Sequence, residues 1–307
     1  MIQAGSARAR LQWLLLIAVP LLVFGVFYCA PIVNLLRLSF AIADSPTGGS
    51  YLPRFDLYTK LLGDEYFLEI VWRTVRLSVL TTLACAIFCY PVSLVVAQSR
   101  GWAQTCLFIV LLMPLMTSVT VTTYGWLILL GQAGFINAVL IGVGILDRPQ
   151  RLLQNETAIV VGLMQVLSVF MVLSVAAALQ SVDPNHVRAA RSLGASPWSA
   201  FWRIVFPQSL PGLRTGSLLV FSLSMSAYAT PGVLGGPRLK FVSFLIYQQA
   251  MQLLDWPRAA SMAVLLLIVT TGMLGLASAY GQLKAWRQQR AQSAGLAMTA
   301  TSQAGAA

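Results

Sequence analysis

Few side chains in this sequence could carry out chemistry. His186 is the only histidine, and the four cysteines all lie inside apolar segments. Cys85 and Cys89 are four residues apart and could share a helix face, but no histidine or second cysteine pair accompanies them. A metal site and a disulfide are therefore poorly supported, and small apolar packing residues are the better interpretation. The chain also lacks a G-x-x-x-x-G-K-[ST] phosphate loop and an H-E-x-x-H zinc motif, so the sequence predicts no catalysis, no metal and no bound cofactor.

The remaining candidates are hydroxyl groups within two otherwise apolar segments. Polar side chains inside a membrane segment face protein or water, because contact with lipid is costly. Helix–helix packing and a solute path explain them about equally well. The residues expected to line a path are Thr117, Ser118, Thr122, Tyr124, Ser222, Ser226, Tyr228 and Thr230. Acids lie only at segment edges, which argues against a proton-coupled carrier and against an anionic cage for a cation.

The composition places these segments in a membrane. The chain is 58% hydrophobic and 9% charged, whereas soluble domains carry about 25% charged residues. Six segments are long and apolar enough to span, and the first is interpreted as an uncleaved anchor. They cover residues 11–36, 71–98, 105–130, 157–179, 215–234 and 259–283. The sequence therefore predicts an all-α integral membrane protein with six transmembrane helices.

The charge distribution does not fix the orientation. Six spans put both termini on one side, and each side then carries ten lysines and arginines. The positive-inside rule counts these basic residues, so it gives a tie. Eight of the nine acids lie on the side without the termini, which is only a weak indication. Basic residues at the ends of spans explain the net charge of +11 without nucleic acid.

One polar segment interrupts the apolar pattern, HVRAARSLGASPWSAFWRIVFP at residues 186–207. Asp183-Pro184 and Ser196-Pro197 each have the form of a helix start, and Gly194 lies between them as a break. Aromatic and aliphatic residues then follow at helical spacing up to Pro207, which we expect to end the second helix. Two interpretations remain open, a helix lying on the lipid surface and a docking element for a cytoplasmic partner.

This segment resembles the EAA loop of the permeases of ABC importers. In the family pattern Glu-Ala-Ala precedes a glycine, and the glycine precedes Ile-x-Leu-Pro. Ala189, Ala190, Gly194, Ile204 and Pro207 match in order and spacing. Three other stretches resemble the spermidine/putrescine-type subfamily: VWRTVRLSVLTTLACAIFCYPVSLVVAQS at 71–99, PLMTSVTVTTYGWLILLGQAGFIN at 114–137 and YATPGVLGGPRLKFVSFLIYQQ at 228–249.

The resemblance implies a non-catalytic subunit of an ATP-driven importer in the bacterial inner membrane. The expected partners are cytoplasmic ATPase subunits that bind ATP and Mg, a second permease subunit, an outer solute-binding protein and lipid. Both termini and the loop would be cytoplasmic. The loop residues expected to meet the ATPase are Arg188, Ala189, Ala190, Gly194, Ala195, Trp198, Phe201, Trp202, Ile204 and Pro207. The expected domains are a tail at 1–10, a first helix and outer loop at 11–56, a transmembrane domain at 57–283 with a coupling loop at 183–213, and a disordered tail at 284–307.

Two positions depart from the family pattern. Arg188 stands where the family has glutamate, so the ATPase would have to carry a compensating acid or leave Arg188 in solvent. Thr122 stands in a stretch where the subfamily often has arginine. The expected solute is a polyamine such as spermidine or putrescine. The alternative is a secondary transporter or channel with a basic loop on the membrane surface.

Overall fold

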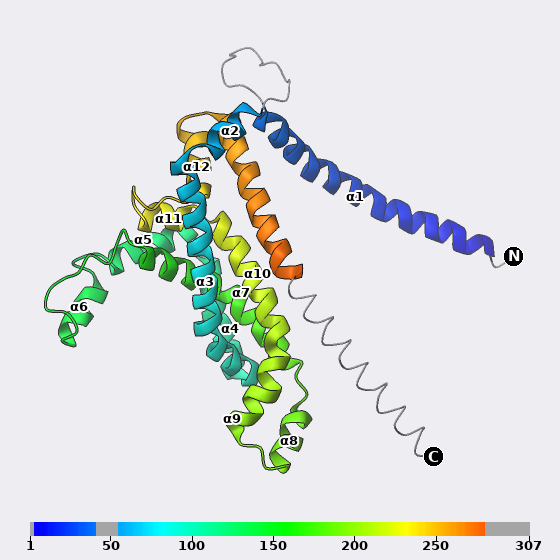
Figure 1. Ribbon diagram of the computed structural model, residues 1–307. Coiled ribbons are helices and arrows are strands. Elements are labelled where there is room, and N and C mark those ends of the chain that lie inside the picture. The colour runs from blue at the N-terminus through cyan, green and yellow to red at the C-terminus, as the bar shows by residue number, and fades with distance from the viewer. Residues whose placement is uncertain (1–2, 41–54, 280–307) are drawn as a thin grey trace, which may run out of the picture. The chain divides into compact units, whose positions relative to one another are not determined.

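The computed structural model describes residues 3–40 and 55–279, and in these two ranges it contains helices, turns and bends but no strand (Figure 1). The predicted all-α fold is therefore confirmed. The predicted tail at 284–307 and much of the predicted outer loop lie outside the described residues. The chain divides into two compact units, residues 1–68 with 245–265 and residues 69–244 with 266–307.

The first unit contains α1 (Gln3–Ser39), α2 (Asp56–Leu62), the π-helical region η2 (Gln248–Gln252) and the start of an unlabelled helix, Trp256–Ala279. α1 is helical from Gln3, so it includes residues expected to form a tail. The hydroxyl of Tyr58 donates to Ser39 Oγ at 2.7 Å, and the hydroxyl of Ser261 donates to the Ser39 carbonyl at 2.9 Å. Ser39 thus joins the end of α1 to two other parts of this unit.

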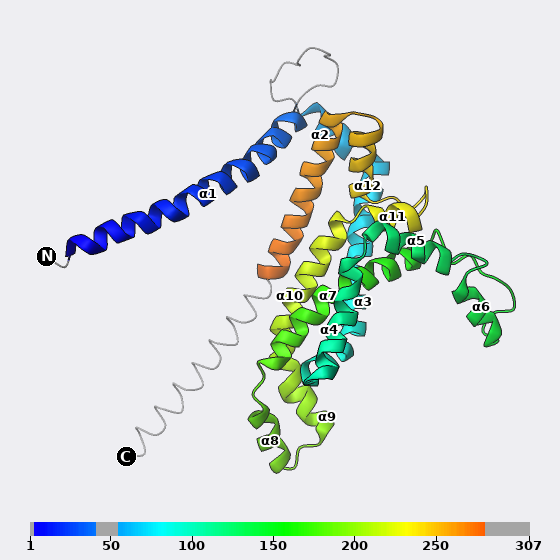
Figure 2. The same cartoon turned by 180° about the vertical axis from the view of Figure 1, so that it is seen from behind.

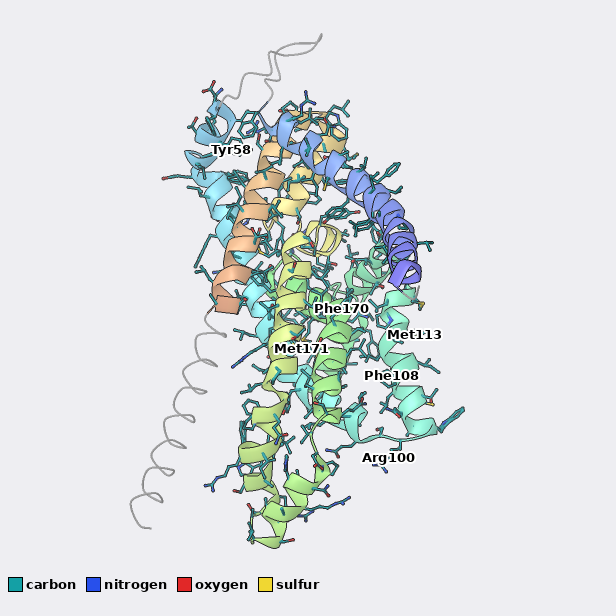
Figure 3. The ribbon with its side chains drawn as sticks, turned by 90° about the vertical axis from the view of Figure 1, so that its right-hand side faces the viewer. Tyr58, Arg100, Phe108, Met113, Phe170 and Met171 are labelled. Atoms are coloured by element: carbon teal, nitrogen blue, oxygen red, sulfur yellow. The ribbon has the colours of Figure 1, made fainter. Side chains whose placement is uncertain are left out.

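The second unit is built on the pair α7 (Glu156–Gln180) and α10 (Phe206–Ser226), which run side by side in both views (Figures 1 and 2). Two glycines of α10 permit the close approach. A Cβ on Gly212 would lie 2.5 Å from Ala178 Cβ and from the Ser174 carbonyl oxygen. A Cβ on Gly216 would lie 2.8 Å from the sulfur of Met171, which is fully buried (Figure 3).

Helix α3 (Glu65–Gln98) contributes a face of small and polar side chains to this core. Cys85 and Cys89 are both buried in the core cluster, which confirms their interpretation as packing residues. Arg76 of α3 forms an ion pair with Glu156 at the start of α7. Arg73 donates to the Arg238 carbonyl at 2.6 Å, and Thr74 Oγ1 accepts from the Val242 amide at 3.1 Å. α3 therefore holds both ends of the segment 238–242.

Four helices in the described ranges are long and apolar enough to span a membrane. They are Leu16–Ser39, Glu65–Gln98, Glu156–Gln180 and Trp256–Ala279, and they coincide with the predicted first, second, fourth and sixth spans. A bent pair of helices brings the number to five. α10 does not meet the same criterion because its first half is polar, so the count of six stays a prediction.

The predicted third span is sharply bent. It forms α4 (Trp102–Met116) and α5 (Val119–Leu129), which meet at an angle of 97°. Thr117 has an extended backbone with ψ of 141°, and Ser118 has ψ of 132°. Pro114 lacks an amide proton, and hydroxyl side chains compete for backbone hydrogen bonds, so helix propagation is weak here.

The predicted fifth span is broken in the same way. α10 ends at Ser226, Ala227 is extended with ψ of 125°, and α11 (Ala229–Leu234) begins after Tyr228. Pro231 lies inside α11, and the Ser243 hydroxyl donates to the Ala227 carbonyl at 2.6 Å. A side chain outside the helix thus satisfies a carbonyl that helix termination leaves without an intrahelical partner.

Candidate functional site

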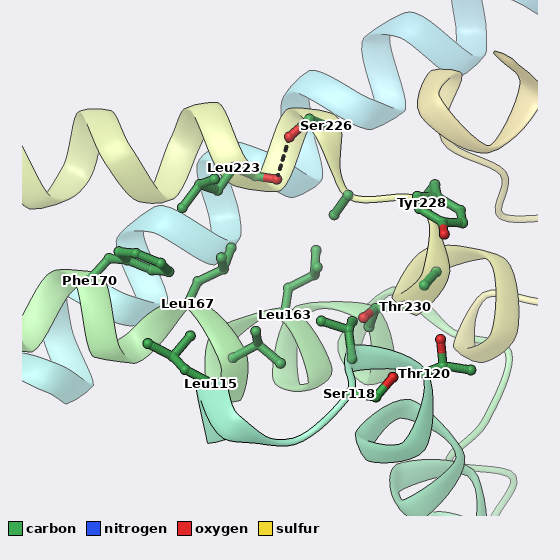
Figure 4. Close-up of a pocket in the computed structure, with 14 residues that line it drawn as sticks. Leu115, Ser118, Thr120, Leu163, Leu167, Phe170, Leu223, Ser226, Tyr228 and Thr230 are labelled. Atoms are coloured by element: carbon green, nitrogen blue, oxygen red, sulfur yellow. Dashed lines mark hydrogen bonds between the residues drawn. The ribbon is translucent and has the colours of Figure 1, made fainter. Parts of the chain in front are cut away.

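The two helix breaks line one pocket of about 540 Å³ (Figure 4). One wall comes from the α4–α5 break, one from the middle of α7, and one from the α10–α11 break. Non-helical backbone inside a membrane is tolerated where it is buried in protein or lines a water-filled cavity. Because both breaks line this pocket, their non-helical backbone does not have to face lipid.

A hydroxyl pair holds the two broken segments together beside this pocket. Thr123 Oγ1 on α5 and Thr230 Oγ1 on α11 are 3.2 Å apart, and both side chains are buried. Thr123 also donates to the Val119 carbonyl at 2.7 Å. α5 and α11 pack closely on each other, so the pair fixes the spacing of the two segments that follow the breaks.

The pocket gathers four of the eight residues predicted for a path. Ser118, Ser226, Tyr228 and Thr230 line it, and the Ser226 hydroxyl bonds the Leu223 carbonyl at 3.1 Å (Figure 4). The other four, Thr117, Thr122, Tyr124 and Ser222, are not among its lining residues. Thr117 and Thr122 bond carbonyls one turn earlier, at Met113 and Ser118.

Most of the lining is apolar and was missed by sequence reasoning. α7 contributes Leu163, Val166, Leu167 and Phe170, which recur at helical spacing on one face. That spacing was the available signal, but α7 is apolar on all sides and gives no contrast between faces. No charged side chain is among the residues that line this pocket.

The loop at 186–207 folds as two helices joined at glycine, as predicted. α8 (Pro184–Ser192) begins where the Asp183 side chain accepts from the Asn185 amide at 2.9 Å. α9 (Pro197–Ala200) begins where Ser196 Oγ accepts from the Ser199 amide at 3.2 Å. Between them Gly194 has φ of +84°, a conformation that side chains with a Cβ disfavour. The loop lies at the end of α7 and α10 opposite α5 and α11 (Figures 1 and 2).

Pro207 does not end the second helix, so that prediction is wrong. The chain passes from α9 through a π-helical turn, η1 (Phe201–Val205), directly into α10. The Phe206 amide donates to the Phe201 carbonyl, five residues earlier. In a regular α-helix the ring of Pro207 would collide with the carbonyl four residues earlier. The wider π-helical turn moves that part of the backbone away from the ring. α9, η1 and α10 therefore form one continuous helix from Pro197 to Ser226.

Between α8 and α9 the loop forms a second pocket, which we call the loop groove, of about 570 Å³. It is lined by Ala190, Leu193, Gly194, Ala195, Ser196, Ser199, Ala200, Arg203 and Ile204. Four of the ten residues predicted to contact an ATPase thus line this groove: Ala190, Gly194, Ala195 and Ile204. Arg188, Ala189 and Pro207 are exposed outside its lining.

An aromatic cluster connects the loop to α3. Trp198, Phe201 and Trp202 contact one another, and Phe201 lies edge-on to Tyr90 of α3 with ring centroids 6.0 Å apart. The Tyr90 hydroxyl and Ser209 Oγ of α10 are 2.8 Å apart. The cluster is only partly buried, and Trp198 remains 71% exposed. The cluster is a physical connection between the loop and the helices that carry the first pocket.

Comparisons with known proteins identify the family of this chain. The family model of the binding-protein-dependent transport system inner membrane component matches residues 14–286, and the chain belongs to this family. The spermidine/putrescine transport system permease protein PotB of Escherichia coli is 30% identical over 81% of this chain and 90% of its own. The inner membrane ABC transporter permease protein YdcU of the same species is 28% identical over 88% of this chain and 90% of its own.

A bacterial alginate ABC transporter, crystallised with its alginate-bound periplasmic protein, has the same fold. One of its chains superimposes with a TM-score of 0.69, at 18% identity, over 88% of this chain and 93% of that chain. The protein is thus a permease subunit of a binding-protein-dependent ABC importer, multi-pass in the inner membrane, and the chemistry of ATP hydrolysis belongs to a separate ATPase chain. This membership rules out the alternative of a secondary transporter or channel.

Proposed function

We propose that the solute of this importer is a polyamine such as spermidine or putrescine, and that the pocket between the two helix breaks is part of its path. The observation that carries the proposal is the 30% identity to a spermidine/putrescine permease over 81% of the chain. The chemistry of the pocket is compatible with it. Hydroxyl oxygens of Ser118, Thr120 and Ser226 are acceptors for ammonium groups, and Phe170 offers an aromatic face to a cation.

A lining without acids also suits passage. A carboxylate in an apolar pocket would hold a polycation strongly, whereas hydroxyls exchange with water at little net cost. The path would therefore bind the polyamine weakly enough to release it in each transport cycle. Selectivity for the polyamine would come mainly from the solute-binding protein that delivers it.

The 186–207 loop would be the contact with the ATPase. Three features support this role: the loop groove, the exposed Leu193 and Trp198, and the aromatic contact with Tyr90. Through them the loop would transmit the closing movement of the ATPase to α10 and α3. In this arrangement ATP and Mg bind the ATPase, the loop and both termini face the cytoplasm, and a second permease subunit completes the path. Lipid surrounds the remaining apolar surface.

Uptake of radiolabelled putrescine and spermidine tests the solute. The complete importer is expressed in a host that lacks polyamine uptake, and the matched control carries an inactive ATPase. ATP-dependent accumulation of either polyamine is expected. Accumulation of neither, with a correctly assembled importer, would reject the polyamine and leave the permease class intact.

Co-purification in mild detergent tests the loop. The intact chain is compared with a variant in which residues 186–207 are replaced by a Gly/Ser linker. An ATPase subunit should come down with the intact chain and not with the variant. Equal recovery from both would assign ATPase binding to another part of the permease.

A further inference from the structure

The loop groove has an unusual combination of concave shape and unpaired positive charge. Arg203 lines the groove, and Arg188 and Arg191 lie on one face of α8 because they are three residues apart. All three side chains belong to exposed residues. The ion pairs found in the described part of the chain, Arg73–Glu69 and Arg76–Glu156, involve none of them.

The loop offers these arginines no acid of its own. Asp183 is the sole carboxylate between α7 and α10, and it caps α8 through the Asn185 amide. Arg188 makes only a long contact of 3.4 Å to the Asn185 side chain. The positive charge of this surface is therefore available to whatever occupies the groove.

Physical chemistry restricts that occupant. A group that fills the groove removes water from Arg203, and a guanidinium that loses water without gaining an acceptor is strongly destabilising. A carboxylate is the best replacement, because it accepts two parallel hydrogen bonds from the guanidinium. Leu193 and Trp198 are 88% and 71% exposed beside the groove, so an occupant also gains by covering apolar surface.

We infer that the loop docks on a net-acidic face of its ATPase, with at least one carboxylate of that face placed against Arg203 and an apolar residue against Leu193. The inference rests on the proposed contact between loop and ATPase and adds the charge of the partner surface. Association is therefore electrostatically steered and sensitive to salt. An ATPase with a basic docking face is rejected, because like charges would meet in a site that excludes water.

An anionic lipid surface is the competing source of negative charge, and the geometry disfavours it. A helix on a bilayer separates its apolar face from its basic face. Here Arg203 and Ile204 line the same concave groove as Leu193, and a flat surface cannot fill a groove between two helices. A protruding protein segment can.

The test measures binding of the co-purifying ATPase to the full-length permease assembly, reconstituted in nanodiscs of neutral phosphatidylcholine. KCl is raised from about 0.05 to about 0.5 M, which shortens the range of electrostatic attraction severalfold. Arg203→Glu and Arg191→Glu are compared with Arg148→Glu, an exposed arginine outside the loop that undergoes the same charge change. Monodispersity in detergent checks that each variant folds.

Affinity should fall steadily with salt, and each loop reversal should weaken binding about tenfold or more at low salt, while Arg148→Glu leaves it unchanged. Arg203→Gln should fall between wild type and Arg203→Glu. If the wild type binds but neither salt nor reversal changes the Kd, the acidic face is refuted and the docking role of the loop stands.

If the wild type and the Gly/Ser loop variant bind the ATPase equally, the proposed contact itself fails, and the inference fails with it. Nanodiscs containing phosphatidylglycerol separate the lipid explanation. Slower amide exchange at residues 183–206 on anionic lipid but not on adding ATPase would overturn the inference in favour of the membrane surface.

Discussion

Single hydroxyls and glycines hold the pocket-forming segments in place. The Thr123–Thr230 pair joins α5 to α11, and both side chains are buried. Gly212 and Gly216 have no side chain, and so α7 and α10 approach more closely than any other residue would permit. Single substitutions that change only one or two atoms can test both features.

Replacing Thr230 with valine keeps the volume of the side chain and removes its hydroxyl. We expect a loss of about 0.5–1 kcal/mol in stability, in line with hydrogen bonds between membrane helices. The measurement is the Tm of the purified permease in detergent. Thr120→Val, at an exposed residue of the same pocket, is the control and should have no comparable effect. Equal Tm values for the two variants would show that the pair contributes nothing.

Gly212→Ala should separate α7 from α10. The new Cβ would lie 2.5 Å from the Ser174 carbonyl oxygen, so the backbone must shift at a cost of about 1–3 kcal/mol. A smaller monodisperse peak on size exclusion, or a lower Tm, would show this destabilisation. Gly275→Ala has no atom within 4 Å of its new Cβ and should behave as wild type. A fully stable Gly212→Ala protein would contradict the close packing.

At the scale of whole helices, one helix connects the loop to the pocket. The helix from Pro197 to Ser226 runs without interruption from the loop to the α10–α11 break, with the π-helical turn accommodating Pro207. A displacement of the loop can therefore reach the pocket through one continuous helix. α8 connects to this helix through Gly194, whose φ of +84° makes the junction sensitive to substitution.

Gly194→Val should uncouple transport while membrane insertion stays intact. A β-branched residue at positive φ strains the junction, and α8 loses its position beside α9. We expect ATP-dependent uptake to fall sharply at an unchanged level of protein in the membrane. Gly144→Val imposes similar strain at φ of +79°, also with open space around the Cβ, and should leave uptake largely intact. Unchanged uptake in Gly194→Val would end the idea of a hinge.

The whole molecule works as one part of an importer that alternates access to its path. The pocket between the breaks should therefore change its exposure to water when the ATPase closes on ATP. A cysteine at Ser226, in a chain whose native cysteines are replaced, should react with a membrane-impermeant maleimide at different rates in nucleotide-free and ATP-trapped importer. Gln98→Cys, at an exposed residue outside the pocket, is the control. Identical rates at position 226 in both states would place the path elsewhere.

Much of the architecture could be read from local features of the sequence. Four apolar segments coincide with long apolar helices, because a spanning helix must be continuously apolar and that property is local. The caps at Asp183 and Ser196 and the positive φ of Gly194 followed from residue types, since each acts on backbone within three residues. The spacing of alanines and glycine in the loop indicated the family, which the family model confirms.

Tertiary structure alone decided what the bends in the chain enclose. The Ala227 carbonyl at the end of α10 accepts from Ser243, and Thr123 of α5 pairs with Thr230 of α11, so residues distant in the chain hold the segments beside the breaks. The pocket lining from α7 was invisible because an all-apolar helix does not reveal its inner face. Sequence therefore determined the class, the long helices and the loop, which rest on local composition and backbone preference. The pocket between the two helix breaks depends on packing between residues far apart in the chain, and only the folded molecule brings those together.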